Sequence, residues 1–458
     1  MADRLVIAPA AAALEGRVSL PGDKSVTHRA LLLASIAQGG TEIAGAGDGE
    51  DNATTLRALE ALGVEILPLG PGLLTVRGAG LYGLHRPDGP IDCGNSGTTA
   101  RLLAGLLAGA GIEATLTGDA SLTRRPMARV ADPLRDLGYS VTASPPGTLP
   151  LRVSSQADMA RQLEPARAVL RVASAQVKSS ILLASLYRRA ATEIVEPEVT
   201  RDHTERLLRA FGVRVASSRH YLHPEQAAAD TMAPFVRLEP PEVLRQRRVE
   251  VPGDISSAAF LFAAALVSGG SVTTSECGVN PTRIAFLSHL RSLGAKVTLR
   301  RNRVTSSGEP VADVTVAAAS LRARSVGASA VPLLIDELPL VAVLGALCEG
   351  ETRIEGAGEL RHKESDRLAS TLALLRAMQV ECEAESDGLV VRGRGRAGWP
   401  AFAFDACGDH RLAMAAAVAA MGATGPCEVT GASCIAISYP GFSDALTSLG
   451  ATLSGSNA

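Results

Sequence analysis

The chain has 458 residues and a formal net charge of −2, with 46% hydrophobic and only 3% aromatic residues. This length exceeds what one hydrophobic core usually supports, so two domains are expected. A near-neutral charge gives no bulk attraction to nucleic acid or to an anionic membrane, and few aromatic residues leave few surfaces on which bases could stack. We therefore expect no nucleic-acid partner, and any anion site must be local.

The apolar residues come in short runs, and none approaches the roughly 18 to 20 residues that a membrane span needs. The first 18 residues have no charged start leading into a continuous apolar stretch, so we expect a cytoplasmic protein without a membrane partner. Seven cysteines lie between Cys93 and Cys434 without CxxC or CxxH spacing. That pattern predicts neither a disulfide framework nor a zinc site.

Six passages repeat one order of elements: a polar helix start, an apolar helix, a strand, a second helix and another strand. They span residues 22–66, 93–141, 173–215, 253–297, 335–382 and 408–453. The first helix of each passage is almost entirely apolar, which predicts that it is buried on all sides. The second is amphipathic and should lie outside: in the first passage Leu56, Leu59 and Leu62 precede Gly63, which is placed to end the helix in the left-handed conformation.

Three passages in each half of the chain predict two domains, each with central helices covered by sheets and outer helices. Gly-Asp turns follow Pro21 and Pro252, and we interpret them as two matched crossings between the domains. The strand "RVSLP" before the first crossing then belongs to the second half. The predicted boundaries are 22–252 for the first domain and 1–21 with 253–458 for the second, with the active site in the cleft between them.

The starts of the buried helices point to an anion site. Three helix N-termini per domain can converge on one surface, and each presents free N–H groups and about half a positive charge. The residues at these starts are Lys24, Ser25 and Arg29; Asn95, Ser96, Gly97 and Thr98; Ser174 and Gln176; Ser256 and Ser257; Asp336 and Glu337; and Asp409, His410 and Arg411. Ordinary N-caps explain Ser256 and Ser257. A cation at a helix N-terminus opposes the dipole, so Lys24, Arg29 and Arg411 indicate a bound anion.

Two further charged clusters have a surface interpretation and a functional one. In "GDASLTRRPM", Arg124 and Arg125 precede Pro126, and we expect one of the two arginines to be functional. In "KESDR", Lys363 and Arg367 share a helical face and, taken alone, fit a solvated i, i+4 pair. The position of this run at the start of the second helix of a repeat favours the functional interpretation.

The motifs "LPGDKSVTHRALLLA", "GNSGTTARLL", "RRPM", "SAQVKSSILLA", "RDHTE", "IDELP", "KESDR" and "DHRLAM" occur in the order found in the 5-enolpyruvylshikimate-3-phosphate synthase family. The chain resembles that family over essentially its whole length. The wording of its motifs resembles the bacterial branch of the family, which is often associated with glyphosate tolerance. The resemblance implies an α/β fold of two inside-out barrel domains, the enolpyruvyl transferase fold, with six βαβαββ-type units, three per domain.

The resemblance also implies an activity. The family transfers the enolpyruvyl group of phosphoenolpyruvate to the 5-hydroxyl of shikimate 3-phosphate and releases phosphate, in the shikimate pathway of aromatic amino-acid biosynthesis. A monomer is expected, with no metal and no organic cofactor. Both substrates carry a phosphate and a carboxylate, so the cleft must be cationic.

Site residues carried over from the family fall into three groups. Shikimate 3-phosphate is expected at Lys24, Ser25, Arg29, Ser174, Ala175, Gln176, Arg201, Asp336 and Lys363. Phosphoenolpyruvate is expected at Lys24, Asn95, Gly97, Arg125, Gln176, Arg367 and Arg411. The catalytic candidates are Asp336 as base at the 5-hydroxyl, Glu364 as proton carrier at the methylene carbon, Lys363 as acid or charge stabiliser, and Lys24. How protons divide among these four groups stays open.

Three positions bear on that carry-over. Ile437 stands where many family members have a lysine, so one phosphoenolpyruvate cation is absent; Thr27 stands where serine is common; and Gly97 keeps a glycine whose replacement by alanine would crowd a mimic of phosphoenolpyruvate.

Two alternative functions use the same fold. The related UDP-N-acetylglucosamine enolpyruvyl transferases usually have Lys-Asn in place of Lys24-Ser25, and a catalytic cysteine in the loop that here has none. A non-catalytic binding protein of the same fold is the other, and Ile437 is the only residue that favours it.

Overall fold

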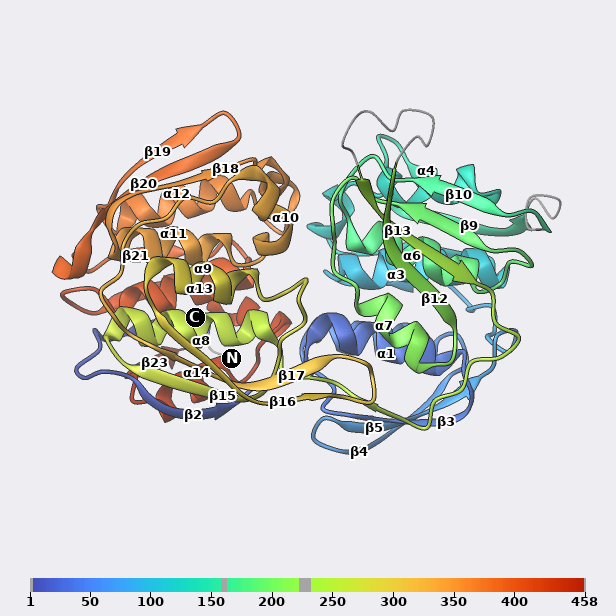
Figure 1. Ribbon diagram of the computed structural model, residues 1–458, viewed down its shortest axis with the longest axis horizontal. Helices are drawn as coiled ribbons and strands as arrows, with labels where there is room; N and C mark the ends of the chain where they lie inside the picture. Colours follow the sequence, from blue (N-terminus) through green and yellow to red (C-terminus); the bar gives the residue numbers. More distant parts are fainter. Residues whose placement is uncertain (1–2, 158–162, 222–231, 457–458) are drawn as a thin grey trace.

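The computed structural model describes residues 3–157, 163–221 and 232–456 in two lobes that lie side by side (Figure 1). One hydrophobic core runs from Val26 to Val251. The other combines Leu5 to Val18 with Ile255 to Ala451. The N-terminal segment therefore packs with the second half of the chain.

The first lobe contains three units of helices and strands. In chain order they are α1 (Lys24–Ser35), β3 (Gln38–Ala44), α2 (Glu50–Glu60), β4 (Glu65–Gly70) and β5 (Leu73–Ala79); β6 (Ile91–Asp92), α3 (Gly97–Ala110), β7 (Ala114–Thr117), η1 (Leu122–Arg124), α4 (Ala128–Asp136), β8 (Tyr139–Ser144) and β9 (Thr148–Ala157); and β10 (Ala166–Val169), α6 (Ala175–Ser185), β11 (Thr192–Val195), α7 (His203–Ala210), β12 (Arg214–Tyr221) and β13 (Met232–Glu239), followed by β14 (Arg248–Glu250).

The second lobe contains three more units and the N-terminal strands. Its elements are β1 (Arg4–Ile7) and β2 (Glu15–Ser19); α8 (Ile255–Ser268), β15 (Ser271–Gly278), α9 (Ala285–Leu293), β16 (Lys296–Val304) and β17 (Pro310–Ala317); η3 (Ala328–Ala330), α10 (Val331–Leu334), α11 (Leu338–Leu347), β18 (Glu349–Glu355), η4 (Gly358–His362), α12 (Arg367–Ala377), β19 (Glu381–Glu385) and β20 (Gly388–Arg394); and η5 (Gly395–Ala397), β21 (Ala403–Asp405), α13 (His410–Ala420), β22 (Cys427–Thr430), η6 (Ala432–Ile437), α14 (Phe442–Ser448) and β23 (Leu453–Ser456).

The sheets show the repeat directly. Across the described residues, four-stranded sheets with the orders β14-β3-β5-β4, β6-β7-β9-β8, β10-β11-β13-β12, β2-β15-β17-β16 and β21-β22-β1-β23 each join one parallel pair to two antiparallel pairs. The sheet β18-β20-β19 has three strands, with isolated parallel bridges from Arg322 and Val326 to β18. The predicted βαβαββ architecture is confirmed.

The order along the chain differs from a simple repeat at the two crossings. The first strand of unit one is β14, which enters from residue 248 onward and pairs with β3. The first strand of unit four is β2, which pairs with β15 as the "RVSLP" segment predicts. The crossings themselves lie side by side, because the Asp23 N–H donates to the Pro252 carbonyl and the Asp254 N–H donates to the Pro21 carbonyl (2.7 and 2.9 Å).

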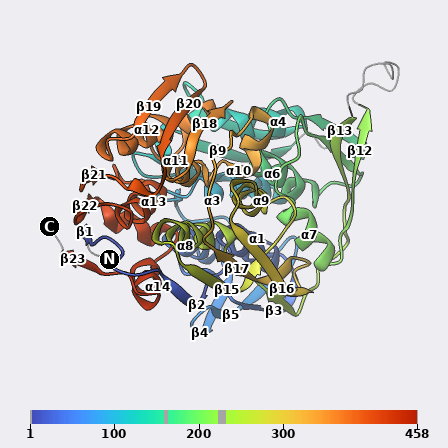
Figure 2. The same cartoon turned by 60° about the vertical axis from the view of Figure 1, so that its left-hand side comes forward.

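The apolar helices lie at the lobe centres as their composition predicts. In the second lobe α8, α13 and α11 pack on one another, and every residue of α11 is buried (Figure 1). Gly63 takes φ of +85°, the left-handed conformation expected just past α2. Both termini lie on the outer side of the second lobe, where β1 pairs with β23 (Figure 2).

The length and apolarity of the helices decide whether any of them could cross a membrane. Among the described residues no single helix is long and apolar enough to cross a membrane, and only the pair Ala328–Leu334 with Leu338–Leu347, bent by 112°, reaches that length together.

Candidate active site

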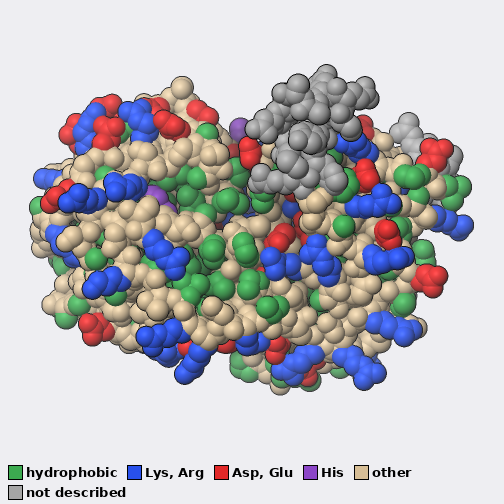
Figure 3. All heavy atoms as spheres, in the orientation of Figure 1, with side chains coloured by type: hydrophobic (Ala, Val, Ile, Leu, Met, Phe, Trp, Pro, Cys, Tyr) green, Lys and Arg blue, Asp and Glu red, His purple; other side chains and the backbone are tan. Residues whose placement is uncertain are grey.

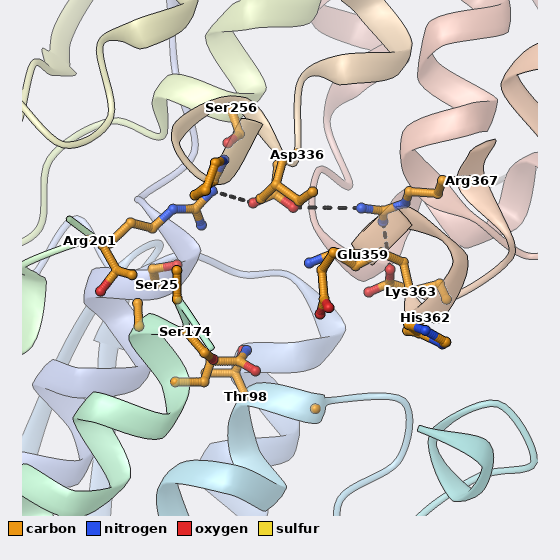
Figure 4. Close-up of a pocket in the computed structure, with 18 of the residues that line it drawn as sticks. Ser25, Thr98, Ser174, Arg201, Ser256, Asp336, Glu359, His362, Lys363 and Arg367 are labelled. Atoms are coloured by element: carbon orange, nitrogen blue, oxygen red, sulfur yellow. Dashed lines mark hydrogen bonds and ion pairs between the residues drawn. The ribbon is translucent and has the colours of Figure 1, made fainter. Parts of the chain in front are cut away.

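A cavity of about 390 Å³ lies between the lobes and is lined by residues from both. All but two of the predicted site residues line it. Those brought together are Lys24, Ser25, Gly97, Arg125, Ser174, Ala175, Gln176, Arg201, Asp336, Lys363, Glu364, Arg367 and Arg411. Figure 4 shows Ser25, Thr98, Ser174 and Arg201 facing Asp336, Lys363 and Arg367 across the cavity.

The six buried helices all begin at this cavity. In the first lobe Lys24 and Ser25 open α1, Gly97 opens α3, and Ser174 caps α6 by accepting from the Val177 N–H. In the second lobe the cavity reaches the starts of α8, α11 and α13, at Ser256, Asp336 and Arg411. The helix N-termini therefore converge as expected, and their free N–H groups favour anions.

Charged side chains are mixed on the surface and gather in the cavity. On the face drawn in Figure 3, basic and acidic side chains both occur on each lobe, as the near-neutral net charge predicts. In the cavity the Lys24 ammonium pairs with the Asp51 carboxylate, and the Lys24 N–H donates to Asp254 Oδ2 (3.1 Å).

Arg29 and Asn95 lie outside the cavity lining. Arg29 is only 4% exposed and donates to Thr204 Oγ1 (2.7 Å), Ser179 Oγ (2.9 Å) and the Ser25 carbonyl (2.8 Å), so it lies one turn beneath Ser25. Burial lowers the pKa of Arg29 to about 10. Asn95 accepts a hydrogen bond from Arg125 Nη2 (2.5 Å). In this structure Arg29 supports Ser25 from behind, and Asn95 orients Arg125.

Asp336 lies among three arginines. Arg201 donates to Asp336 Oδ2, and Asp336 carboxylate oxygens lie 3.6 Å from guanidinium nitrogens of Arg367 and of Arg411 (Figure 4). Burial alone would raise the pKa of Asp336, but the positive charges, led by Arg411 and Arg201, hold that pKa well below its usual value. These positive charges therefore keep Asp336 in its ionised form.

Glu364 has a similar environment. Arg367 Nη2 donates to Glu364 Oε2 (2.6 Å), and Arg125 Nη1 lies 3.5 Å from Glu364 Oε1. Burial opposes ionisation, yet Arg367 and Arg125 hold the pKa of Glu364 well below its usual value. The Glu364 carbonyl also accepts from Ser121 Oγ (3.2 Å), a contact between the lobes.

Lys363 and Arg367 complete this group. Burial, with the repulsion of Arg367, lowers the pKa of Lys363, which makes its ammonium a better proton donor. Arg367 is 1% exposed, and its Nε donates to Asp409 Oδ2 (2.8 Å). Asp409 is also the N-cap of α13 and accepts from the Arg411 N–H. One buried carboxylate thus holds the Arg367 guanidinium and caps the helix that carries Arg411.

Of the arginine pair at 124 and 125, the structure selects one. Arg125 is buried and lines the cavity, whereas Arg124 is exposed and does not. Ile437, at the end of η6, is half-buried and does not line the cavity. Its carbonyl lies 2.6 Å from the position that a Cβ on Gly49 would take, so this residue packs against the start of α2.

Sequence reasoning missed several lining residues. Arg101 donates to Gln176 Oε1 (2.6 Å) and follows Gly97 by one helical turn, so helix periodicity could have found it. Arg129 pairs with Glu359 across the lobes (2.6 Å), and Arg283 donates to Ser256 Oγ (2.6 Å). These two contacts join segments far apart in sequence, and no local pattern marks them.

Among the described residues, no group of three or more His, Cys, Asp or Glu side chains could hold a metal ion. The seven cysteines are free thiols, and Cys407 is the one that is exposed.

Comparisons with known proteins agree on one family. The model of the family described as EPSP synthase (3-phosphoshikimate 1-carboxyvinyltransferase) matches residues 9–446. A protein named 3-phosphoshikimate 1-carboxyvinyltransferase from Alkalilimnicola ehrlichii is 44% identical, over 94% of this chain and 92% of its own length. One of the same name from Synechococcus sp. is 45% identical, over 96% of this chain and 97% of its own length.

Solved structures give the same result. The EPSP synthase from Acinetobacter baumannii has a TM-score of 0.83 and 35% identity, and the match covers 99% of this chain and 100% of that one. The enolpyruvyl transferase NikO from Streptomyces tendae has a TM-score of 0.75 at 18% identity, over the whole of both chains, which shows a shared fold.

Proposed function

Because this chain belongs to the EPSP synthase (3-phosphoshikimate 1-carboxyvinyltransferase) family, we propose that its interlobe cavity binds both substrates. The first lobe mainly binds the substrates, and the second lobe transfers the protons. The enzyme transfers the enolpyruvyl group of phosphoenolpyruvate to the 5-hydroxyl of shikimate 3-phosphate and releases phosphate, in the shikimate pathway. The curated relatives at 44–45% identity carry that name, so transfer to UDP-N-acetylglucosamine is not favoured.

The lobes are the two domains, 22–252 and 1–21 with 253–458. The two separate cores and the paired crossings near Gly22 and Gly253 support this division. A monomer in the cytoplasm is part of the same proposal and rests on the family resemblance.

In the bound state the cavity cations hold the substrate anions. Ser174 and Arg201 bind the phosphate of shikimate 3-phosphate, with Ser25, Ala175 and Gln176 around the rest of that substrate. Arg125, Arg367, Arg411 and Lys24 bind the phosphate and carboxylate of phosphoenolpyruvate, next to Gly97. Arginine suits both groups because its planar fork donates two parallel hydrogen bonds to a carboxylate or phosphate.

Substrate binding changes the proton affinity of the carboxylates. Arg201, Arg367 and Arg411 keep Asp336 ionised, and Arg125 and Arg367 keep Glu364 ionised. When substrate anions engage these arginines, their field at the carboxylates is partly cancelled, and the pKa of each carboxyl group rises. Glu364 can then carry a proton at neutral pH.

The reaction proceeds by addition and elimination. Asp336 accepts the proton of the 5-hydroxyl as that oxygen bonds to C2 of phosphoenolpyruvate, and Glu364 gives a proton to C3, so the methylene group becomes a methyl group. In the tetrahedral intermediate C2 carries both oxygens. Glu364 then takes a proton back from the methyl carbon as the bond from C2 to the phosphate oxygen breaks. The proton that Asp336 accepted passes to the departing phosphate, whose charge Lys363 stabilises, so both carboxyl groups return to their starting states.

One observation carries this assignment: Asp336 and Glu364 lie on either side of a single buried guanidinium, 3.6 and 2.6 Å from nitrogens of Arg367. Two carboxylates fixed at separate points around the cation that binds phosphoenolpyruvate can act on two different atoms of the reacting pair.

The test is phosphate release by purified protein from phosphoenolpyruvate with shikimate 3-phosphate as acceptor. Release with this acceptor and none with UDP-N-acetylglucosamine is the expected result. Release only with the second acceptor, or binding of substrates without release, would overturn the proposal.

A further inference from the structure

A buried ionic cluster lies behind the proposed phosphate site of shikimate 3-phosphate. Lys178 Nζ is 2.8 Å from Glu196 Oε2 and 2.8 Å from Glu205 Oε1, and the three side chains are 2%, 2% and 1% exposed. None of the three lines the cavity. Burying charges is costly, and apolar residues of similar size often give equal or better stability, so stability alone does not account for the cluster.

The cluster joins the segments that carry the phosphate ligands. Lys178 lies one turn into α6, and its N–H donates to the carbonyl of Ser174 (3.1 Å). Glu196 directly follows β11 and accepts a hydrogen bond from the Thr200 hydroxyl. Thr200 lines the cavity and precedes Arg201. Through Glu196, the ammonium of Lys178 therefore fixes the loop that presents Arg201 against the helix start that presents Ser174.

A second layer continues the cluster to the start of α1. Ser179 and Thr204 hydrogen bond to each other (2.6 Å), and both accept from Arg29. Arg29 in turn donates to the carbonyl of Ser25 (2.8 Å). The cations Lys178 and Arg29 together balance the carboxylates of Glu196 and Glu205, and the charge of Glu205 raises the pKa of Arg29 against the effect of burial.

The phosphoenolpyruvate arginines are held by other partners. Arg125 is oriented by Asn95 (2.5 Å), and Arg367 by Asp409 (2.8 Å). The ionic cluster thus contacts the segments of Ser25, Ser174 and Arg201, which belong to one substrate.

We propose that Lys178 is a positioning residue for shikimate 3-phosphate: it sets the separation of Ser174 and Arg201, so that both reach one phosphate group. The proposal rests on the assignment of these two residues to that phosphate under the proposed function. Loss of the Lys178 ammonium releases the Arg201 loop, so affinity for shikimate 3-phosphate falls while phosphoenolpyruvate binding and proton transfer stay in place.

The first experiment is Lys178→Met, which keeps the length and removes the charge. We expect KM and the calorimetric Kd for shikimate 3-phosphate to rise on the order of 10-fold, because small displacements of positioning groups have effects of that size or larger. KM for phosphoenolpyruvate and kcat at saturation should stay within about twofold of wild type, since their ligands have other partners. Equal changes for both substrates, or no change for either, would overturn the proposal.

A second variant removes the effect of unpaired buried charge. Lys178→Met with Glu196→Gln removes one charge of each sign and leaves Glu205 to balance Arg29, so it should fold even if the single variant does not. We expect the same selective loss of affinity for shikimate 3-phosphate. Failure of this variant to fold would also count against the proposal, because the cluster would then serve the fold rather than the substrate.

Two controls separate the possible causes. Leu182→Ala removes buried volume from the same helix, so it should lower the melting temperature without a selective effect on shikimate 3-phosphate. If it raises that KM as much as Lys178→Met does, general destabilisation is the cause. Arg201→Met tests the assignment of Arg201 to the phosphate. If Arg201→Met weakens binding of shikimate 3-phosphate and Lys178→Met does not, only this inference is overturned. If neither variant weakens that binding, the phosphate assignment is overturned as well.

Discussion

The two walls of the cavity differ in charge. The first lobe contributes five cations, Lys24, Arg101, Arg125, Arg129 and Arg201, against one carboxylate, Asp51. The second lobe contributes four cations, Arg283, Lys363, Arg367 and Arg411, against four carboxylates, Asp254, Asp336, Glu359 and Glu364. The lobes share a fold unit and the convergence of helix N-termini, so the difference comes from the side chains that line each wall and not from the backbone architecture.

This difference separates binding from chemistry. An excess of cations attracts and orients anions but offers few groups that can accept a proton. A balanced wall keeps carboxylates ionised beside cations, and their proton affinity changes when an anionic ligand competes for those cations. We infer that the first lobe mainly binds the substrates and the second lobe moves the protons. Each prediction below tests one side of this comparison.

The largest effect is expected for Asp336→Asn. The amide cannot accept the proton of the 5-hydroxyl, and general base catalysis typically contributes about 10²- to 10⁴-fold, so we expect kcat to fall about 1000-fold. KM for shikimate 3-phosphate should stay within a few-fold of wild type, because Arg201 is released from its ion pair with Asp336. Steady-state phosphate release measures both constants, and Asp387→Asn, an exposed position in the same lobe, is the control. Unchanged turnover would place the base elsewhere.

On the wall that the first lobe contributes, Arg125→Met should reduce affinity for phosphoenolpyruvate. Loss of one partner in a buried charge pair costs roughly 2–5 kcal/mol, so KM for phosphoenolpyruvate should rise on the order of 100-fold. At saturation kcat should change much less, since binding of the ground state and of the transition state is weakened alike. The matched control is Arg124→Met at the exposed neighbouring residue, which should leave both constants near wild type. A fall in kcat for Arg125→Met with an unchanged KM would reverse the roles of the walls.

A smaller effect is expected for Gly97→Ala on the same wall. The added Cβ would lie 3.1 Å from Arg101 Nη1 and 3.4 Å from Arg125 Nη1, closer than most such contacts. Because Arg101 is held by Gln176, the crowding should displace Arg125 by a few tenths of an ångström. We expect KM for phosphoenolpyruvate to rise roughly threefold to tenfold. Gly89→Ala, where the new Cβ meets nothing within 4 Å, is the control. The same KM for phosphoenolpyruvate in both variants would show that a Cβ at Gly97 fits without displacing Arg125.

The smallest effect concerns stability and pH. The folded-state pKa values of Asp336 and Glu364 lie below their unfolded values, so the stability that these groups contribute is present above about pH 4.5 and is lost as pH falls through the folded pKa values. Between pH 6 and pH 3 the melting temperature of the substrate-free enzyme should therefore fall more than that of Asp336→Asn/Glu364→Gln, by about 2 °C or more. Differential scanning fluorimetry measures both curves. Parallel curves would show that the two carboxylates are not held by the arginines.

Much of the fold follows from local patterns. The apolar helix in each repeat had to be buried, and glycines such as Gly63 mark the helix ends. The strands β2 and β14 are harder to assign, because each completes a unit whose other elements lie on the far side of a crossing. Only the paired Gly-Asp turns pointed to that exchange, and they did so for the N-terminal strand alone.

The site residues also fall into those that local patterns predict and those that they do not. The cations Lys24 and Arg411 at helix starts were predicted from their conflict with the helix dipole, and Ser174 from the family resemblance. Arg29 was predicted at the site from the same conflict and from its motif, yet its four-residue spacing from Ser25 puts it one turn behind the cavity wall. Arg283 lies in the turn before α9 and Glu359 in η4, and both are positioned by contacts between segments that no local spacing encodes.

The most direct test of the division between the walls is Glu364→Gln, with turnover and binding measured on the same protein. The amide keeps the shape and cannot carry a proton, so phosphate release at saturating substrates should fall at least 100-fold. Calorimetric dissociation constants for both substrates should stay within about threefold, because the cations of the first lobe are untouched. Normal phosphate release, or a loss of affinity that accounts for the whole loss of activity, would contradict the account.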